Sequence, residues 1–201
     1  MKIFLTRHGE STANRDGIIQ GHADYPLSDR GRDQATELAH RIKNKGLKFD
    51  KIFSSDLKRA AETTKIVSEI IDDQNIEYSS LIREFDLGIY SGRKLTDLEK
   101  KGDDFLEDVW KNQTIKVPGG ECVQDMVTRI EKFMKNLMKS SHSTILVIAH
   151  GGVLFHVIHT MFDLYRPPEG AWFKNCSLNI LEFKNDKWKL LEFNEKEFSG
   201  I

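Results

Sequence analysis

Short apolar segments alternate with longer amphipathic segments along most of this 201-residue chain. A short run rich in Ile, Phe, Val and Leu is typical of a buried strand, and apolar residues spaced three or four apart are typical of a helix packed on it. The alternation predicts an α/β fold, a three-layer α/β/α sandwich with a mostly parallel central sheet. The expected strands are residues 2–6, 51–54, 76–79 and 145–149, and the expected helices are residues 28–46, 56–71, 121–139 and 153–161.

The C-terminal part has a different pattern. Residues 177–183 and 188–193 alternate apolar and polar side chains, and Asn185-Asp186 between them favours a tight turn. We expect a β-hairpin that adds an antiparallel edge strand, which a second copy of the chain could pair with. No repeat or linker-like tract interrupts residues 1–201, so we expect one domain, as a monomer or a homodimer. Residues 85–117 lack clear periodicity and are expected to form a lid over the sheet.

Charge and cysteine content exclude several classes of protein. The 30 basic and 31 acidic side chains leave a formal charge of -1, which favours neither nucleic acid nor an anionic membrane as partner. The N-terminal apolar run stops at Thr6-Arg7, too early for a signal peptide, and no segment has the length of a membrane span. The two cysteines predict neither a disulfide framework nor a zinc site. These features favour a cytoplasmic location.

Basic side chains stand where the expected strands end. The first strand ends at Arg7-His8, the fourth ends at His150, and the helix after the second carries Arg59 one turn from its start. Ligands of open α/β sheets bind outside the carboxyl ends of the strands. The sequence therefore predicts that two imidazoles and two guanidiniums meet in one crevice, although they are far apart along the chain.

The chemistry of this group fits a phosphate ester. Guanidinium groups bond phosphate oxygens in pairs, and the helix expected after Gly151 would direct backbone N–H groups at an anion. A neutral imidazole is available near pH 7 and can attack phosphorus. The chain has no Gly-x-x-x-x-Gly-Lys-Ser/Thr sequence, so a nucleotide-binding P-loop is not expected.

Residues around these strand ends resemble a known family. The block Arg7-His8-Gly9-Glu10-Ser11-x-x-Asn14 is similar to the signature of the histidine phosphatase superfamily, the phosphoglycerate mutase-like proteins. A lone Arg-His-Gly occurs by chance in many proteins. Here further blocks of the family follow in order over nearly the whole chain, which a chance match does not explain. They are Gln20-Gly21, Leu27-Ser28-x-x-Gly31-x-x-Gln34-Ala35, Ser54-Ser55-Asp56-Leu57-x-Arg59-Ala60-x-x-Thr63, Leu81-x-x-Glu84-x-x-x-Gly88, Pro118-Gly119-Gly120-Glu121 and His150-Gly151-Gly152.

The resemblance implies a set of catalytic residues. His8 would be the nucleophile that becomes phosphohistidine. Arg7, Arg59 and His150 would surround the equatorial oxygens of the phosphate. Glu84 would protonate the leaving oxygen and then activate water. The segment that follows Glu84 resembles the phosphatase branch of the family.

The resemblance also implies binding residues. Asn14 is similar to a residue that contacts the transferred phosphate, Gln20 and Gly21 resemble part of the substrate-facing rim, and Gly151 would offer its backbone to the phosphate. Cys122 stands where many relatives have serine, which makes the contacts of the Pro-Gly-Gly-Glu loop uncertain. Neither a metal nor another cofactor is implied.

Plainer interpretations exist for the same residues. A strand-end histidine is often only a polar terminus, and Arg59 could be a solvated helix residue. Glu10 and Asp86 are alternatives to Glu84, which is preferred because it alone has the family spacing. The remaining histidines are interpreted as packing or surface residues; they are His22, His40, His142, His156 and His159.

Three functions stay open, of which a phosphatase acting on a small phosphorylated metabolite is favoured. A mutase must exclude water from its phosphoenzyme, and the mutases of this family carry a long charged insertion where this chain has only residues 85–117. A cofactor-dependent phosphoglycerate mutase and a non-catalytic phospholigand-binding protein are the alternatives.

The substrate is open at this level. Sugar phosphates, phosphoglycerates, phosphoserine and the nucleotide-loop phosphate of cobalamin synthesis are candidates. Residues 14–25 and 85–117 are expected to form the variable rim. Most of its large apolar residues are interpreted as packing the lid onto the sheet; they are Phe85, Ile89, Tyr90, Phe105 and Trp110.

Overall fold

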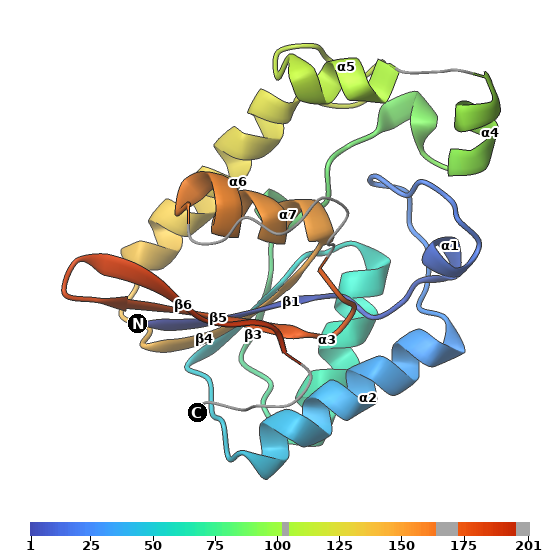
Figure 1. The fold of residues 1–201 in the computed structure, drawn as a ribbon. Helices are drawn as coiled ribbons and strands as arrows, with labels where there is room; N and C mark the ends of the chain where they lie inside the picture. The colour runs from blue at the N-terminus through green and yellow to red at the C-terminus, as the bar shows by residue number, and fades with distance from the viewer. Residues whose placement is uncertain (102–104, 164–172, 196–201) are drawn as a thin grey trace.

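A six-stranded sheet forms the centre of the computed structural model, which describes residues 1–101, 105–163 and 173–195 (Figure 1). The strand order is β3-β2-β4-β1-β5-β6. The first four strands in this order are mutually parallel, whereas β5 is antiparallel to β1 and β6 is antiparallel to β5. The predicted mostly parallel sheet with a C-terminal hairpin is therefore confirmed. The strands are β1 (Lys2–Arg7), β2 (Lys51–Ser54), β3 (Ile76–Tyr78), β4 (Thr144–Ala149), β5 (Leu178–Lys184) and β6 (Lys187–Glu195).

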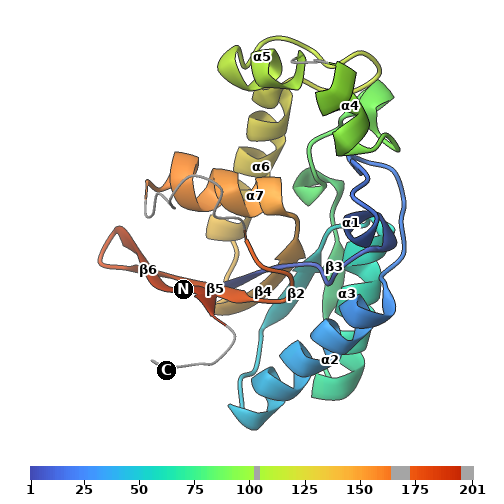
Figure 2. The ribbon, with the colours of Figure 1, turned by 45° about the vertical axis from the view of Figure 1, so that its right-hand side comes forward.

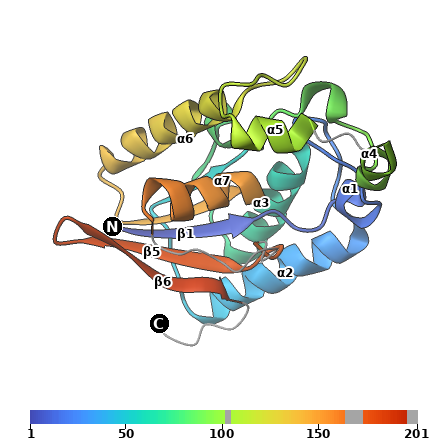
Figure 3. The same ribbon diagram turned by 45° about the horizontal axis from the view of Figure 1, so that its top comes forward.

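Helices cover both faces of the sheet, as the layered prediction requires (Figures 1 and 3). On one face lie α2 (Asp29–Asn44) and α3 (Lys58–Ile71). On the other lie α6 (Val123–Met138) and α7 (Gly151–Phe155). Successive side chains of a strand point to opposite faces, so each central strand supplies apolar residues to both cores: in β4, Leu146 faces α2 and α3, while Val147 faces α6 and α7.

The boundaries of α2 show how the sequence fixes a helix locally. Ser28 precedes the helix, and its Oγ accepts a hydrogen bond from the Gly31 N–H at 3.0 Å, which satisfies a backbone donor that the first turn leaves free. The inward stripe includes Leu38 and Ile42, both fully buried. The helix ends just before Gly46, whose φ of 63° is the left-handed conformation that glycine adopts without strain.

The register of β1 on β4 brings the two histidines together. Arg7 lies opposite Ala149 in parallel pairing, so His8 and His150 leave the sheet side by side at its carboxyl edge. Ser54 of β2 lies opposite Ile148, which puts Ser55 at the same edge. The chain segments that approach this edge therefore decide what else the site contains.

Short helices surround this edge instead of further strands (Figure 2). None of the described residues of the predicted lid belongs to a strand of the sheet, and its α4 and α5 lie on the same side of the sheet as α6 and α7. Phe85 and Tyr90 are buried and pack under it, as predicted, but Trp110 and Ile89 are about half exposed. The short elements are α1 (Thr12–Arg15), η1 (Ser80–Ile82), η2 (Gly88–Tyr90), α4 (Leu95–Lys101) and α5 (Phe105–Lys111).

The structure differs from the sequence prediction at the helix expected over residues 153–161. The α-helical part α7 ends at Phe155, and the chain continues as a π-helical segment, η3 (His156–Met161). The side chains of His156 and His159 are buried, which agrees with their interpretation as packing residues. Among the helices that the structure describes, none combines the length and the hydropathy that crossing a bilayer requires. Cys122 and Cys176 are buried free thiols.

Candidate active site

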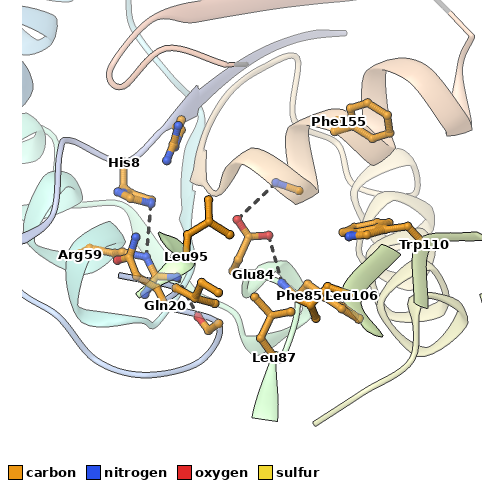
Figure 4. Close-up of a pocket in the computed structure, with 14 residues that line it drawn as sticks. His8, Gln20, Arg59, Glu84, Phe85, Leu87, Leu95, Leu106, Trp110 and Phe155 are labelled. Atoms are coloured by element: carbon orange, nitrogen blue, oxygen red, sulfur yellow. Dashed lines mark hydrogen bonds between the residues drawn. The ribbon is translucent and has the colours of Figure 1, made fainter. Parts of the chain in front are cut away.

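A pocket of about 450 Å³ lies where the sheet edge meets the short helices (Figure 4). It brings together residues from β1, α3, α7 and the segments on either side of η1 and η2. Six of the nine predicted site residues line it: Arg7, His8, Gln20, Gly21, Arg59 and Glu84. His150 is outside the lining, but its ring is next to that of His8. The predicted convergence of distant segments at the carboxyl ends of the strands is thus present in the structure.

The ring of His8 is held in one tautomer. Its Nδ1 lies 2.7 Å from the carbonyl oxygen of Gly9, which can only accept a hydrogen bond, so Nδ1 carries the proton. Its Nε2 lies 3.3 Å from Nε of Arg59, a group that can only donate. The lone pair of the imidazole is therefore on Nε2, the atom that faces the guanidinium, as nucleophilic attack on phosphorus requires.

Both histidines at the sheet edge are kept neutral. Burial first, and then the charges of Arg59 and Arg7, lower the pKa of His8 well below its usual value. Burial and the same arginines, with His8, lower the pKa of His150 in the same direction. The rings lie close together, with centroids 5.1 Å apart. A neutral His8 can act as a nucleophile without first losing a proton.

Two buried side-chain nitrogens beside His8 have no hydrogen-bond partner among the described residues. Nε of Arg7 and Nδ1 of His150 make no hydrogen bond to any described residue. The other ends of these side chains are fixed: Nη1 of Arg7 donates to the Phe173 carbonyl oxygen at 3.0 Å, and Nε2 of His150 lies 2.8 Å from Oγ of Ser55. A buried donor without an acceptor costs about 1–3 kcal/mol. An anion with several oxygens would satisfy these donors.

Arg59 supplies the positive charge at the bottom of the pocket. Its side chain is only 1% exposed, and its two terminal nitrogens donate to the carbonyl oxygens of Gly21 at 2.9 Å and Ala23 at 3.2 Å. Burial lowers the pKa of Arg59 to about 10, so the guanidinium stays charged at neutral pH. The plainer interpretation of Arg59 as a solvated helix residue is therefore wrong.

Glu84 brings a carboxylate to the same pocket (Figure 4). Its Oε1 accepts from the backbone N–H of Phe85 at 3.0 Å, and its Oε2 accepts from that of Gly152 at 3.3 Å. Of its rivals, Glu10 accepts a hydrogen bond from Ser28 and Asp86 pairs with His22 at 3.3 Å. Neither rival lines the pocket. The position of Glu84 suits proton transfer to an ester oxygen.

Long-range contacts fix the backbone at Glu84, and sequence analysis did not find them. The Glu84 carbonyl oxygen accepts from Nη2 of Arg129 at 2.8 Å and lies 2.7 Å from Nε2 of His22. Arg129 is in turn paired with Glu121 at 2.6 Å. The Pro-Gly-Gly-Glu block contained a signal for Glu121, but no local pattern distinguishes Arg129 or His22 from surface residues.

Two predicted binding residues are placed differently from the others. Asn14 does not line the pocket; its Oδ1 accepts from the backbone N–H of Ser11 at 3.2 Å and so caps α1. Gly151 is also outside the lining, which instead includes its neighbour Gly152. Gln20 lines the pocket, and its Oε1 accepts from Oγ of Ser11 at 2.7 Å. Asn14 therefore supports the loop, whereas Gln20 borders the pocket.

The close approach of Gly152 to Glu84 makes a specific prediction. A Cβ at Gly152 would lie 2.3 Å from Oε1 of Glu84, so Gly152→Ala must displace the carboxylate. We expect kcat/KM for an alkyl phosphate to fall roughly 10- to 100-fold, since displacements of about 1 Å cost this much. Gly151→Ala is the matched control, because its Cβ would meet nothing closer than Nε of Arg7 at 3.9 Å. Equal losses in the two variants would contradict the steric explanation.

The buried neutral histidines also predict how stability depends on pH. The pKa values of His8 and His150 are lowered on folding, so between those values and about 6.5 the unfolded chain binds more protons than the folded one. Their contribution is fully present above about pH 6.5 and is lost as the pH falls, with a slope of at most about 1.4 kcal/mol per pH unit for each group. Urea denaturation from pH 7.5 to 5 should show this slope, and His150→Asn should reduce it. The exposed His40 is the control, and a reduced slope in His40→Ala would contradict the assignment.

The fold and these side chains define an α/β protein with a histidine, two arginines and a glutamate in one pocket at the carboxyl edge of its sheet. The sequence matches the family described as histidine phosphatase superfamily (branch 1) over residues 3–196. It is 29% identical to a broad-specificity phosphatase of Saccharomyces cerevisiae, over 92% of this chain and 81% of the yeast protein. It is also 28% identical to a protein of Salmonella paratyphi B named a probable phosphoglycerate mutase, over 94% of this chain and 87% of that protein.

A solved structure agrees over the full length. The alpha-ribazole phosphatase of Shigella flexneri is 25% identical, covers 100% of both chains and superimposes with a TM-score of 0.84. The chain belongs to the histidine phosphatase superfamily, branch 1, and is a phosphatase of that family. The resemblance on which the sequence analysis relied is therefore confirmed.

Proposed function

We propose that this enzyme hydrolyses phosphomonoesters of small metabolites through a phosphohistidine on His8. The observation that carries the proposal is the grouping of His8, whose Nδ1 carries the proton and whose Nε2 accepts from Arg59, with buried nitrogens of Arg7 and His150 that have no partner among the described residues. The names of the relatives, a broad-specificity phosphatase and an alpha-ribazole phosphatase, support a small phosphorylated substrate.

The reaction has two steps. In the first, His8 Nε2 forms a bond to phosphorus as the ester P–O bond breaks, and a protonated Glu84 gives its proton to the leaving oxygen. Arg7, Arg59 and His150 stabilise the charge on the equatorial oxygens. In the second, Glu84 takes a proton from water, the water oxygen bonds to phosphorus, and the N–P electron pair returns to His8. Inorganic phosphate and the free alcohol are the products.

This mechanism draws on side chains and water only. Within the described parts of the chain, no group of three or more His, Cys, Asp or Glu side chains is placed to hold a metal ion. We also propose that residues 1–201 act as one catalytic domain, with residues 85–117 as its lid. A monomeric or homodimeric state and a cytoplasmic location both stay predictions.

A phosphoglycerate mutase is the second candidate, because one relative bears that name. A single-turnover reaction with 3-phosphoglycerate whose phosphate group is labelled with ³²P distinguishes the two functions. We expect an acid-labile, alkali-stable label on the protein and then free phosphate. Efficient formation of 2-phosphoglycerate with little free phosphate would contradict the phosphatase proposal, and a protein that binds phosphate without becoming labelled would contradict catalysis through His8.

A further inference from the structure

The half of the pocket away from His8 is apolar. In Figure 4 the wall formed by Phe155, Trp110 and Leu106 stands on the opposite side from His8 and Arg59. The apolar residues that line the pocket come from five separate segments, which are α4, α5, α7 and the loops that follow α1 and η1. The apolar lining residues are Ile19, Phe85, Leu87, Leu95, Leu106, Trp110 and Phe155.

This wall does more than pack the lid onto the sheet. Phe85 is buried and its ring lies against that of Trp110, with centroids 5.4 Å apart. Trp110 itself is 49% exposed, Leu95 50% and Phe155 44%, although all three line one pocket. Large apolar side chains left this accessible around a single concavity mark a surface that gains free energy when an apolar group covers it.

The cationic side chains of the pocket lie at its His8 end. Among the described lining residues the cations are Arg7, which directly precedes His8 in the chain, and Arg59, whose Nε donates to His8 Nε2 at 3.3 Å. Of the described residues that line the pocket, Glu84 alone is acidic, and it lies between the two ends. A second anionic group on a substrate would lie among apolar side chains and near a carboxylate, without a cation to pair with. Burial of an unpaired charge is costly.

We infer that the preferred substrates are phosphate monoesters of uncharged alcohols with an apolar body about the size of an aromatic ring. This inference rests on the proposed function, since it concerns the leaving alcohol of that reaction. The volume of about 450 Å³ has room for a phosphate and such a body. Substrates with a carboxylate or a second phosphate, such as phosphoglycerates, would be turned over less efficiently.

A set of esters with similar alkoxide leaving groups tests the inference. The probes are 2-phenylethyl phosphate, ethyl phosphate and 3-phosphoglycerate. Because their leaving groups are similar alkoxides, differences in kcat/KM report mainly on how the pocket accepts the rest of each substrate. We expect 2-phenylethyl phosphate to exceed ethyl phosphate by about 100-fold, which is what burial of a phenyl group is worth. We expect 3-phosphoglycerate to be no better than ethyl phosphate.

Variants assign the preference to the wall. Trp110→Ala should reduce the 2-phenylethyl to ethyl ratio to about 10 or less. Leu95→Arg, which adds a cation at an exposed position, should raise kcat/KM for 3-phosphoglycerate relative to 2-phenylethyl phosphate. Tyr78→Ala is the matched control, because Tyr78 is equally exposed, at 49%, but lies on β3 away from this pocket, and it should leave the ratio unchanged.

The outcomes separate the two levels of the proposal. Equal kcat/KM for the two alkyl esters, or a preference for 3-phosphoglycerate, would overturn the inference while the enzyme remained a phosphatase. A ratio that Trp110→Ala and Tyr78→Ala change equally would also overturn it. If the wild-type enzyme hydrolysed none of the esters and acquired no label on His8, the proposed function would fail and the inference with it.

Discussion

His8→Ala is expected to reduce phosphatase turnover by at least about 10⁴-fold and to abolish labelling of the protein. His8 Nε2 is the atom that would bond to phosphorus, whereas the Nε2 of the neighbouring His150 is 2.8 Å from Oγ of Ser55. The measurement is kcat for p-nitrophenyl phosphate in both proteins, together with labelling by ³²P-phosphate esters quenched in alkali, in which phosphohistidine is stable. The thermal unfolding midpoint of each protein shows whether the variant is folded.

The control for this variant is another histidine. His40→Ala removes an exposed imidazole from α2, far from the pocket lining, and should keep wild-type turnover and labelling. A folded His8→Ala protein that retained more than a few per cent of wild-type turnover would contradict the mechanism. So would a stable label that appeared on another side chain.

Much of the phosphate end of the site could be predicted from the sequence because regular structure places it. His8 and His150 each follow directly after a strand, and parallel strands end at one edge of the sheet, so the pairing of Arg7 with Ala149 brings them together. Arg59 could be placed because α3 follows the second strand and begins at the same edge. Alternation and periodicity determine these positions within a residue or two.

Glu84 could not be placed in this way. It lies between η1 and η2, outside every strand, and only the family spacing pointed to it. The contacts that hold its carbonyl oxygen come from His22 and Arg129, which are far from it in the sequence. Such contacts depend on how separate segments pack, and no local pattern encodes them.

The apolar wall was missed for a related reason. Packing against the sheet and facing a pocket both require an apolar residue on the inner side of an element, so periodicity does not distinguish them. Phe85 and Tyr90 are buried as predicted, but Trp110 on α5 is half exposed and lines the pocket. Phe155 lines the same pocket from α7, a helix whose predicted role in the site was limited to the backbone N–H groups at its start.

Glu84→Gln should lose activity to a degree that depends on the leaving group. An alkoxide needs the proton that Glu84 supplies, so we expect kcat/KM for 2-phenylethyl phosphate to fall by about 10³-fold. The p-nitrophenolate ion leaves without a proton, so phosphorylation of His8 by p-nitrophenyl phosphate should be nearly normal. Hydrolysis of the phosphohistidine still needs the base and should be slow. Stopped-flow absorbance should therefore show a burst of p-nitrophenolate, about one per active site, before slow turnover.

The two rival carboxylates are the controls, because they differ from Glu84 in where they lie. Asp86 pairs with His22 and accepts from the Gly88 N–H, and Glu10 accepts from Ser28, so neither faces the pocket. Asp86→Asn and Glu10→Gln should change kcat/KM for 2-phenylethyl phosphate and for p-nitrophenyl phosphate by similar factors, and neither variant should give a burst of p-nitrophenolate. A burst in either of them, or equal losses on the two esters in Glu84→Gln, would mean that Glu84 only positions the substrate and that another group moves the proton. A burst confined to Glu84→Gln would assign both proton transfers to this carboxylate. The single substitution would then have slowed the departure of the alkoxide and the attack of water, while the attack of His8 on phosphorus stayed intact.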